Sequence, residues 1–248
     1  MHYFIKISLL IGFVLLVSCQ SKLENKEQQK AKNAEVISNE VKPDFIRLTN
    51  ENIIDELTIF GIENPETEVL IETSLGNISI KLYAETPLHR ANFVRLIKLG
   101  YFDETVFYRV IAGFVAQGGN SRNPTHAAKR LEYGDYTVPP EFNAKFVHKK
   151  GALAMARGYT NNRKKRSAAY DFYLVQGELN APNGTNYTED QKATYQNSGG
   201  VPYLDNEHTV FGEITNGFDV LDKICAVPVD NANWPLTEIS IKIKLLSI

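Results

Sequence analysis

The chain has 248 residues, of which 43% are hydrophobic and 23% are charged, and its formal net charge is −2. This composition is ordinary for a globular protein, and the length leaves room for one domain and little more. Because the charge is nearly balanced, we expect no nucleic-acid partner.

The N-terminus has the organisation of an export signal. Lys6 precedes an apolar run over residues 7–17, which is short for a bilayer span but typical of a signal-peptide core. The run ends in LVSC, which resembles the lipobox of bacterial lipoproteins, where the cysteine is acylated and becomes the new N-terminus. We expect residues 1–18 to be a lipoprotein signal peptide and Cys19 to carry lipid, which would anchor an exported domain to a membrane of the bacterial cell envelope. An ordinary secretory signal that ends near a cysteine is the alternative.

Two segments are expected between the signal and the main domain. Residues 19–44 are rich in Lys, Glu, Gln and Asn and contain almost nothing to bury, which predicts a disordered tether. Such a tether reaches roughly 25–30 Å on average; a solvated helix is the alternative. Residues 45–66 are predicted to be a helical extension, because apolar residues recur there at helical spacing, namely Ile53, Ile54, Leu57 and Phe60.

The main domain is expected at residues 67–248 and opens with a hairpin. Apolar residues alternate over 69–73 and again over 78–82, on either side of a Gly-Asn turn. The period then changes and predicts a helix, with Pro87 in its first turn and Gly100 just after its end.

Short strands dominate the rest of the pattern. A helix is also expected in FDVLDKICAV, where Cys225 fits a buried small side chain better than a reactive thiol. Strand-like segments are found at residues 106–115, 152–156, 172–176, 209–214 and 239–245, four before this helix and one after it. Many short strands with two helices between them predict a mainly antiparallel barrel or sandwich.

One of these segments, FYRVIAGFVAQGG, carries Arg109 and Gln117 among apolar neighbours. An arginine is almost never fully buried unless it is paired, so this strand is unusual. The segment resembles the central motif of the cyclophilins, the cyclosporin-binding class of peptidyl-prolyl isomerases. Further blocks resemble the family's pattern in the family's order: TSLGNISIKLYAETPLHRANFVRLIKLGYF, GALAMARG, YDFYLVQG and YLDNEHTVFGEITNGFDVLDKI. The resemblance covers about residues 68–248, with one insertion.

The resemblance implies a closed eight-stranded antiparallel barrel with two capping α-helices and a substrate groove on its outer wall. It implies that Arg109 is the catalytic arginine, that Gln117 positions it and that Phe114 floors a proline pocket. It also implies peptide-binding positions at Val115, Ala156, Arg157, Tyr173, Tyr203, Leu204 and His208. Taken one at a time, these residues fit a surface ion pair or core packing better, so the functional interpretation depends on their joint match. The histidines show no metal-ligand spacing, and no metal or other cofactor is expected.

Three site positions depart from the family's pattern. Asp171 stands where the family has glutamine and adds a carboxylate that would either orient Arg109 or compete for it. Val115 replaces a methionine, and Tyr203 occupies the position that is tryptophan in the most cyclosporin-sensitive members.

Two segments beside the expected groove have no assigned role. The basic run at residues 163–166 is either a solvated surface or a means of selecting acidic clients or an anionic surface. The insertion at residues 178–203 either walls the groove or binds a partner, and a short helix is expected within it at residues 189–195.

The expected reaction explains why a strand carries these polar groups. An X-Pro bond turns slowly because amide resonance imposes a barrier of ~18–20 kcal/mol. In the twisted transition state the proline nitrogen regains a lone pair, which a fixed and always charged donor such as Arg109 can stabilise. We interpret the chain as a monomeric peptidyl-prolyl cis-trans isomerase whose partners are unfolded or folding proline-containing envelope polypeptides. A proline-peptide binding module or holdase with weak turnover, and a purely structural barrel, are the alternatives.

Overall fold

The computed structural model describes residues 45–179 and 187–246. The predicted signal peptide, Cys19, the predicted tether and residues 180–186 of the predicted insertion lie outside these residues. Within the two described ranges, no helix is long and apolar enough to cross a membrane.

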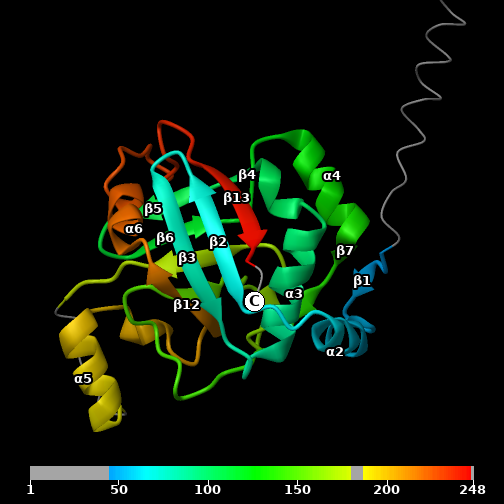
Figure 1. Ribbon diagram of the computed structural model, residues 1–248, viewed down its shortest axis with the longest axis horizontal. Helices are drawn as coiled ribbons and strands as arrows, with labels where there is room; N and C mark the ends of the chain where they lie inside the picture. Colours follow the sequence, from blue (N-terminus) through cyan, green and yellow to red (C-terminus); the bar gives the residue numbers. More distant parts are fainter. Residues whose placement is uncertain (1–44, 180–186, 247–248) are drawn as a thin grey trace, which may run out of the picture. The chain divides into compact units, whose positions relative to one another are not determined.

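A curled antiparallel sheet of nine strands forms the centre of the described part (Figure 1). The strands follow the order β4-β13-β2-β3-β12-β9-β11-β6-β5 across the sheet. In chain order they are β2 (Glu68–Thr73), β3 (Gly76–Leu82), β4 (Thr105–Val106), β5 (Arg109–Ile111), β6 (Val115–Gly118), β9 (Ala152–Met155), β11 (Phe172–Val175), β12 (Val210–Asn216) and β13 (Ser240–Leu245). Two small pairs stand apart from it: β1 (Leu48–Thr49) with β7 (Gly134–Asp135), and β8 (Thr137–Val138) with β10 (Ser167–Ala168).

The predicted closed barrel of eight strands is not confirmed: the sheet is curled but not closed and has nine strands, and the strand expected at residues 106–115 shows one reason for the difference. That segment is divided into β4, β5 and the beginning of β6. Gly113 has φ +73°, a left-handed conformation that favours glycine, and it turns the chain so that β5 and β6 pair as a hairpin. β4 and β5 are the two end strands of the sheet order, although only two residues separate them in the chain.

Five α-helices lie in the described ranges, one more than the four that were predicted: two in the domain, one in the extension and a short one within the insertion. α4 was not predicted, although Asn123 caps it by accepting a hydrogen bond from the Thr125 backbone and Pro124 opens it. The short helix expected at residues 189–195 is present as α5, which begins with a capping box between Thr188 and Gln191. The five helices are α2 (Ile53–Glu63), α3 (Pro87–Lys98), α4 (Pro124–Tyr133), α5 (Glu189–Ser198) and α6 (Phe218–Cys225).

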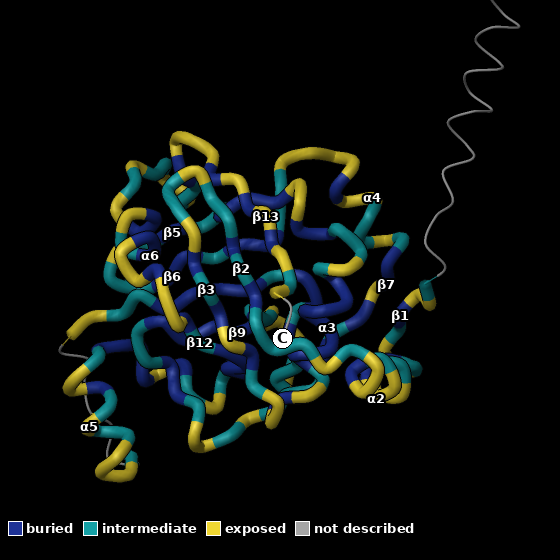
Figure 2. The backbone as a smooth tube through the Cα atoms, in the orientation of Figure 1, coloured by how far each residue is buried: buried dark blue, intermediate teal, exposed yellow. Residues whose placement is uncertain are grey.

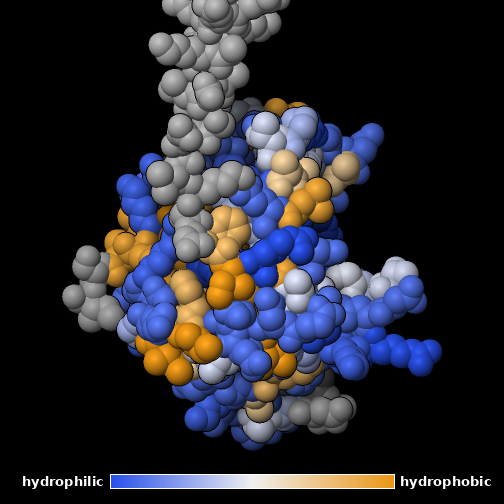
Figure 3. Space-filling model, turned by 90° about the vertical axis from the view of Figure 1, so that its right-hand side faces the viewer, coloured by the Kyte–Doolittle hydropathy of each residue, from blue (hydrophilic) through white to orange (hydrophobic). Residues whose placement is uncertain are grey.

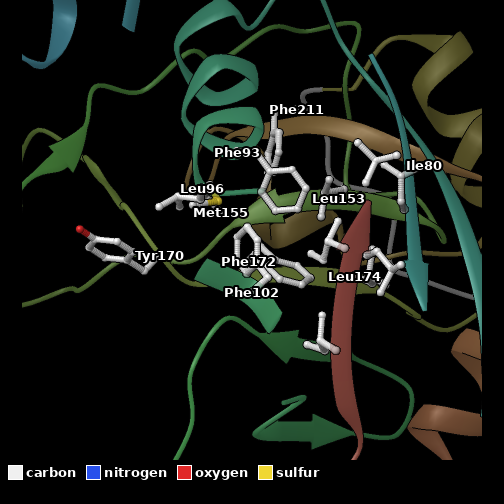
Figure 4. Packing of buried hydrophobic residues seen from close by; sticks show 14 of the residues in the cluster. Ile80, Phe93, Leu96, Phe102, Leu153, Met155, Tyr170, Phe172, Leu174 and Phe211 are labelled. Atoms are coloured by element: carbon white, nitrogen blue, oxygen red, sulfur yellow. The ribbon is translucent and has the colours of Figure 1, made fainter. Parts of the chain in front are cut away.

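The core lies between the sheet and α3, where the tube in Figure 2 is mostly buried, whereas the only buried residue of α5 is Tyr195. Phe93 of α3 is fully buried and contacts three other buried aromatic rings (Figure 4). Its ring centroid lies 5.0 Å from that of Phe102, 5.5 Å from that of Phe172 and 5.4 Å from that of Phe211. The contacts with Phe172 and Phe211 are edge-to-face and add to the stabilisation from burial, so these rings fix α3 against β11 and β12.

α2 packs on α3 through a buried cation. The guanidinium of Arg90 donates hydrogen bonds to the carbonyl oxygens of Gly61 and Asn64, both at 2.7 Å, at the end of α2. A positive charge at a helix C-terminus is favourable, because the last carbonyl groups of the helix lack partners within it. The predicted apolar stripe is only partly right: Ile53 and Leu57 are buried, whereas Ile54 is half exposed.

One face of the molecule has a mixed surface that is not dominated by one apolar area. On the face presented in Figure 3, apolar residues lie in separate patches among hydrophilic ones. Isolated exposed apolar side chains are normal for a globular domain and need no special role.

Candidate active site

The β5–β6 hairpin carries the two polar residues of the FYRVIAGFVAQGG segment. Arg109 and Gln117 are direct partners in the antiparallel register, so their side chains lie on the same face of the sheet. A guanidinium Nη of Arg109 lies 3.4 Å from Oε1 of Gln117 and donates to it. The guanidinium carbon also lies 5.8 Å from the centre of the Phe114 ring, which comes from the turn of the same hairpin. Both polar side chains remain partly exposed.

A hollow of about 270 Å³ opens beside this pair. The β5–β6 hairpin supplies one side of it, while the segment after β9, strand β11, the end of η2 (Pro202–Leu204) and the segment after η2 supply the rest. The lining residues are Arg109, Phe114, Val115, Gln117, Ala156, Arg157, Tyr159, Tyr173, Leu204 and His208. The structure therefore brings together nine of the eleven side chains that the sequence placed at this site, and adds Tyr159.

Tyr173 presents its ring to the hollow and its hydroxyl to the protein interior. The hydroxyl lies 2.9 Å from Nε2 of His148, which is fully buried, and Nδ1 of His148 lies 2.7 Å from a carboxylate oxygen of Asp205. Burial lowers the pKa of His148 against the opposing effect of Asp205, so the ring is neutral, donates from Nδ1 and accepts at Nε2. Tyr195 of α5 donates to the second oxygen of Asp205 at 2.5 Å. The polar atom of Tyr173 is thus satisfied away from the hollow, which leaves an apolar surface there.

His208 is held as a neutral part of the hollow. Its Nδ1 lies 3.1 Å from the carbonyl oxygen of Met155 and its Nε2 lies 2.8 Å from the hydroxyl of Tyr159. Burial lowers the pKa of His208 to about 4. At neutral pH the imidazole is uncharged and is not a general acid.

Arg157 offers its backbone groups to the hollow, because its guanidinium is already bonded to Glu207. Its guanidinium donates to the backbone oxygen of Glu207 at 2.7 Å and to the Glu207 carboxylate at 2.5 Å, and it stacks on the Tyr159 ring. The N–H and C=O of Ala156 are both used, by Asp171 and Ala168. Among the backbone hydrogen bonds of residues 45–179 and 187–246, none uses the N–H or C=O of Arg157. These two groups are therefore available to an extended ligand.

Two predicted site residues lie outside the hollow. Asp171 forms its ion pair with Arg130 of α4, at 2.8 Å, and no ion pair joins it to Arg109 in the described part of the chain. Tyr203 is 68% exposed, but its ring stacks on that of Phe114 at 6.0 Å with an interplanar angle of 16°. Tyr203 lines a second hollow of about 530 Å³ that shares His208 with the first.

The basic run at residues 163–166 is partly structural. Lys165 pairs with Glu207 at 2.5 Å, and Arg166 donates to the backbone and hydroxyl oxygens of Thr137. Arg163 and Lys164 are exposed. Only half of the run is therefore a solvated surface.

The sequence analysis missed four residues that support the site: Tyr108, Arg130, His148 and Tyr159. Tyr108 and Tyr159 stand directly beside motif residues, so their proximity could have been noticed. His148 and Arg130 act through partners 57 and 41 residues away along the chain. No local sequence pattern indicates a contact between residues so far apart in the chain.

Comparison with known proteins shows which family the chain resembles. The family model for cyclophilin type peptidyl-prolyl cis-trans isomerase/CLD matches residues 68–244. A putative peptidyl-prolyl cis-trans isomerase of Staphylococcus haemolyticus is 29% identical over 188 residues, which cover 73% of this chain and 91% of that protein. The peptidyl-prolyl cis-trans isomerase-like 2 protein of Rhizopus delemar is 34% identical over 176 residues, which cover 69% of this chain. A putative bifunctional phosphatase/peptidyl-prolyl cis-trans isomerase of Streptococcus pyogenes is 30% identical over 225 residues, which cover 81% of this chain.

The matches differ in how much of each relative they span. The chain covers only 27% of the Rhizopus protein and 46% of the Streptococcus protein. Among solved structures, a cyclophilin type peptidyl-prolyl cis-trans isomerase of Cryptosporidium parvum, crystallised in the presence of the dipeptide Ala-Pro, has a TM-score of 0.55 at 24% identity. That match covers 73% of this chain and 99% of the other, and it shows a shared fold. With its family model matched from residue 68 to residue 244, this chain belongs to the cyclophilin-type peptidyl-prolyl cis-trans isomerases.

Proposed function

We propose that this chain catalyses rotation about X-Pro bonds in unfolded or folding polypeptides, with Arg109 as the catalytic residue. The observation that carries the proposal is the pairing of Arg109 with Gln117 in the lining of a hollow that also contains Phe114. The hollow of about 270 Å³ is of a size to receive a proline ring.

The proposed chemistry needs one positioned donor and no nucleophile. Rotation breaks the amide resonance that imposes the barrier of ~18–20 kcal/mol, and the proline nitrogen becomes pyramidal with a free lone pair. A guanidinium N–H of Arg109 directed at this lone pair interacts with the transition state more strongly than with either planar isomer. Arginine stays protonated at neutral pH, so it stabilises the nitrogen electrostatically without giving up its proton.

The other residues of the hollow would hold the substrate. Phe114, Val115, Tyr173 and Leu204 offer apolar contacts to the proline ring, and the hydroxyl of Tyr173 does not intrude because it faces His148. The unused N–H and C=O of Arg157 would pair with the client's backbone. This arrangement selects proline by shape and reads little else of the client's sequence.

Arg109→Ala in the purified full-length chain tests the proposal. Removing a preorganised donor of this kind costs about 10²–10³ in rate, so kcat/KM on proline peptides should fall by that factor, whereas peptide affinity should change much less. Arg109→Lys should recover little, because a point-like ammonium does not reproduce the planar fork. The matched control is Arg163→Ala, which removes an exposed arginine outside the hollow. A variant Arg109→Ala that turns over like the wild type would favour the proline-peptide binding module instead.

We also propose that the chain is a lipoprotein of the bacterial cell envelope. This proposal depends on the LVSC sequence at the end of the apolar run, since Cys19 lies outside the described residues. Cys19→Ser should block acylation and release the protein from the membrane fraction or stall its processing. A Cys19→Ser protein that is cleaved normally and stays tightly bound to the membrane would refute the lipobox interpretation.

A further inference from the structure

The amide of Gln117 is held in one orientation by the residues behind it. Its Oε1 accepts from Arg109, and its Nε2 donates to the hydroxyl oxygen of Tyr108. The hydroxyl of Tyr108 in turn donates to a carboxylate oxygen of Asp171 at 3.2 Å. Because a hydroxyl has one proton, its donation to Asp171 leaves its oxygen to accept from Gln117. A flipped amide would place its NH₂ group against the guanidinium of Arg109, donor against donor.

The carboxylate of Asp171 is in turn paired with the guanidinium of Arg130. Arg130 donates to both of its carboxylate oxygens, with one Nη at 2.8 Å and the other at 3.2 Å. Two further donors of Arg130 are used, by the hydroxyl of Tyr101 and the carbonyl of Gly119, both at 2.8 Å. Burial disfavours the charge of Arg130, but Asp171 outweighs it and raises the pKa of Arg130 above its ordinary value. The pair is therefore fixed in position and carries no net charge.

We propose that Tyr108, Asp171 and Arg130 are positioning residues for isomerisation, which hold the Gln117 amide in the orientation that accepts from Arg109. Together with Gln117 they form what we call the Arg130 network. Arg130 comes from α4 and Gln117 from β6, whereas Tyr108 and Asp171 are the residues just before β5 and β11. The inference rests on the proposed function, since positioning matters only if Arg109 is the catalytic group.

The network also explains how a carboxylate is tolerated so near a catalytic cation. An unpaired Asp171 would attract the guanidinium of Arg109 and draw it away from the substrate nitrogen. With Arg130 on both of its oxygens, Asp171 keeps one interaction toward the site, the bond from Tyr108. The ion pair thus converts a competing charge into a fixed hydrogen-bond acceptor.

The first test is Tyr108→Phe, which removes one hydroxyl and keeps the ring. Turnover and affinity are separated by NMR exchange measurements on a proline peptide at saturating and subsaturating concentrations. Loss of one hydrogen bond of this kind should lower kcat about 3- to 10-fold, while the dissociation constant of the peptide stays within about twofold. The matched control is Tyr136→Phe, which loses a buried hydroxyl bonded to Asn92 at 2.7 Å and should keep its kcat. Wild-type kcat in Tyr108→Phe, or an equal loss in both variants, would overturn the proposal.

The second test distinguishes positioning from a purely structural role. Arg130→Met leaves Asp171 unpaired and should lower kcat, because the free carboxylate attracts Arg109. The double variant Arg130→Met/Asp171→Asn removes that charge and keeps an acceptor for Tyr108, so its kcat should recover toward wild type. If Arg130 only stabilises the fold, the double variant will be no faster than Arg130→Met, and the proposal fails.

A third readout does not depend on turnover. The side-chain NH₂ signals of Gln117 report directly on its hydrogen bond to Tyr108, and they should shift in Tyr108→Phe but not in Tyr136→Phe. A wild-type chain that does not isomerise proline peptides would refute the proposed function, whatever these signals do. Unchanged Gln117 signals in Tyr108→Phe, in a chain that is active, would refute the positioning network alone.

Discussion

Replacing Tyr173 by phenylalanine separates the two faces of this side chain. The ring lines the hollow, while the hydroxyl bonds to Nε2 of His148 at 2.9 Å in a position without solvent exposure. Tyr173→Phe removes the hydroxyl and leaves that nitrogen buried without a donor. The cost of leaving a buried acceptor unsatisfied is about 1–3 kcal/mol. Since 1 kcal/mol shifts Tm by about 2–4 °C in a domain of this size, the change should be measurable by thermal or urea unfolding.

Activity should respond differently from stability. The apolar surface that Tyr173 offers to the hollow is unchanged by the substitution, so kcat/KM on proline peptides should stay within about twofold of wild type. Tyr159→Phe is the control for stability, because Tyr159 is 67% exposed and water can replace its hydroxyl beside His208. That control should lose no more than about 0.5 kcal/mol.

A double-mutant cycle with His148→Leu gives the decisive comparison. In that background the buried nitrogen is absent, so Tyr173→Phe should cost clearly less than it does in the wild-type chain. Equal costs in the two backgrounds would show that the hydroxyl of Tyr173 matters for some other reason. Loss of activity without loss of stability would show that the hydroxyl faces the substrate instead.

Two further predictions follow from burial and backbone geometry. Burial lowers the pKa of His208 from 6.5 to about 4, and it also lowers that of His148, so the unfolded chain binds more protons between these values. Stability should therefore be constant above about pH 6.5 and decrease as the pH falls toward 4, and a urea midpoint that is flat across this range would contradict the assignment. Gly177 has φ +65°, and a Cβ there would lie 2.3 Å from the Cα of Gly200, so Gly177→Ala should cost more than about 2 kcal/mol or prevent folding. Gly158→Ala, which meets no atom within 4 Å, should be near neutral in the same unfolding experiment.

Sequence patterns predicted the helices and strands that are determined by neighbouring residues in the chain. Alternating apolar residues predicted the β2–β3 hairpin, and the change of period at Pro87 predicted α3. The expected Gly-Asn turn is wrong by two residues, because the turn lies at Ser74 and Leu75, whereas Gly76 and Asn77 already pair with β2 as the first residues of β3. The same reasoning read residues 106–115 as one strand, because the apolar content continues through the turn at Gly113. α4 has the N-terminal signals of a helix in Asn123 and Pro124, but its weakly apolar sequence hid it.

The candidate site was predictable only through the family pattern. That pattern named the residues which line the hollow, but it could not say which atoms they use. Asp171 was expected near Arg109, and the structure instead pairs it with Arg130, because a helix absent from the prediction brings a second arginine to it. Likewise, no pattern around Tyr173 indicates that its hydroxyl turns toward His148, 25 residues earlier. Such choices depend on long-range packing rather than on local sequence.

The contact of Arg90 with the end of α2 decides where this protein can safely be shortened. The family match begins at residue 68, which invites a truncated chain that starts there. Such a chain would lack the carbonyl groups of Gly61 and Asn64, and the guanidinium of Arg90, now only 8% exposed, would lose these partners. It would also uncover the side of α3 on which α2 rests, including Ala91 beside Gly61. The smallest soluble fragment for biochemical work should therefore begin before residue 53 and keep α2 whole, even though the family boundary excludes it.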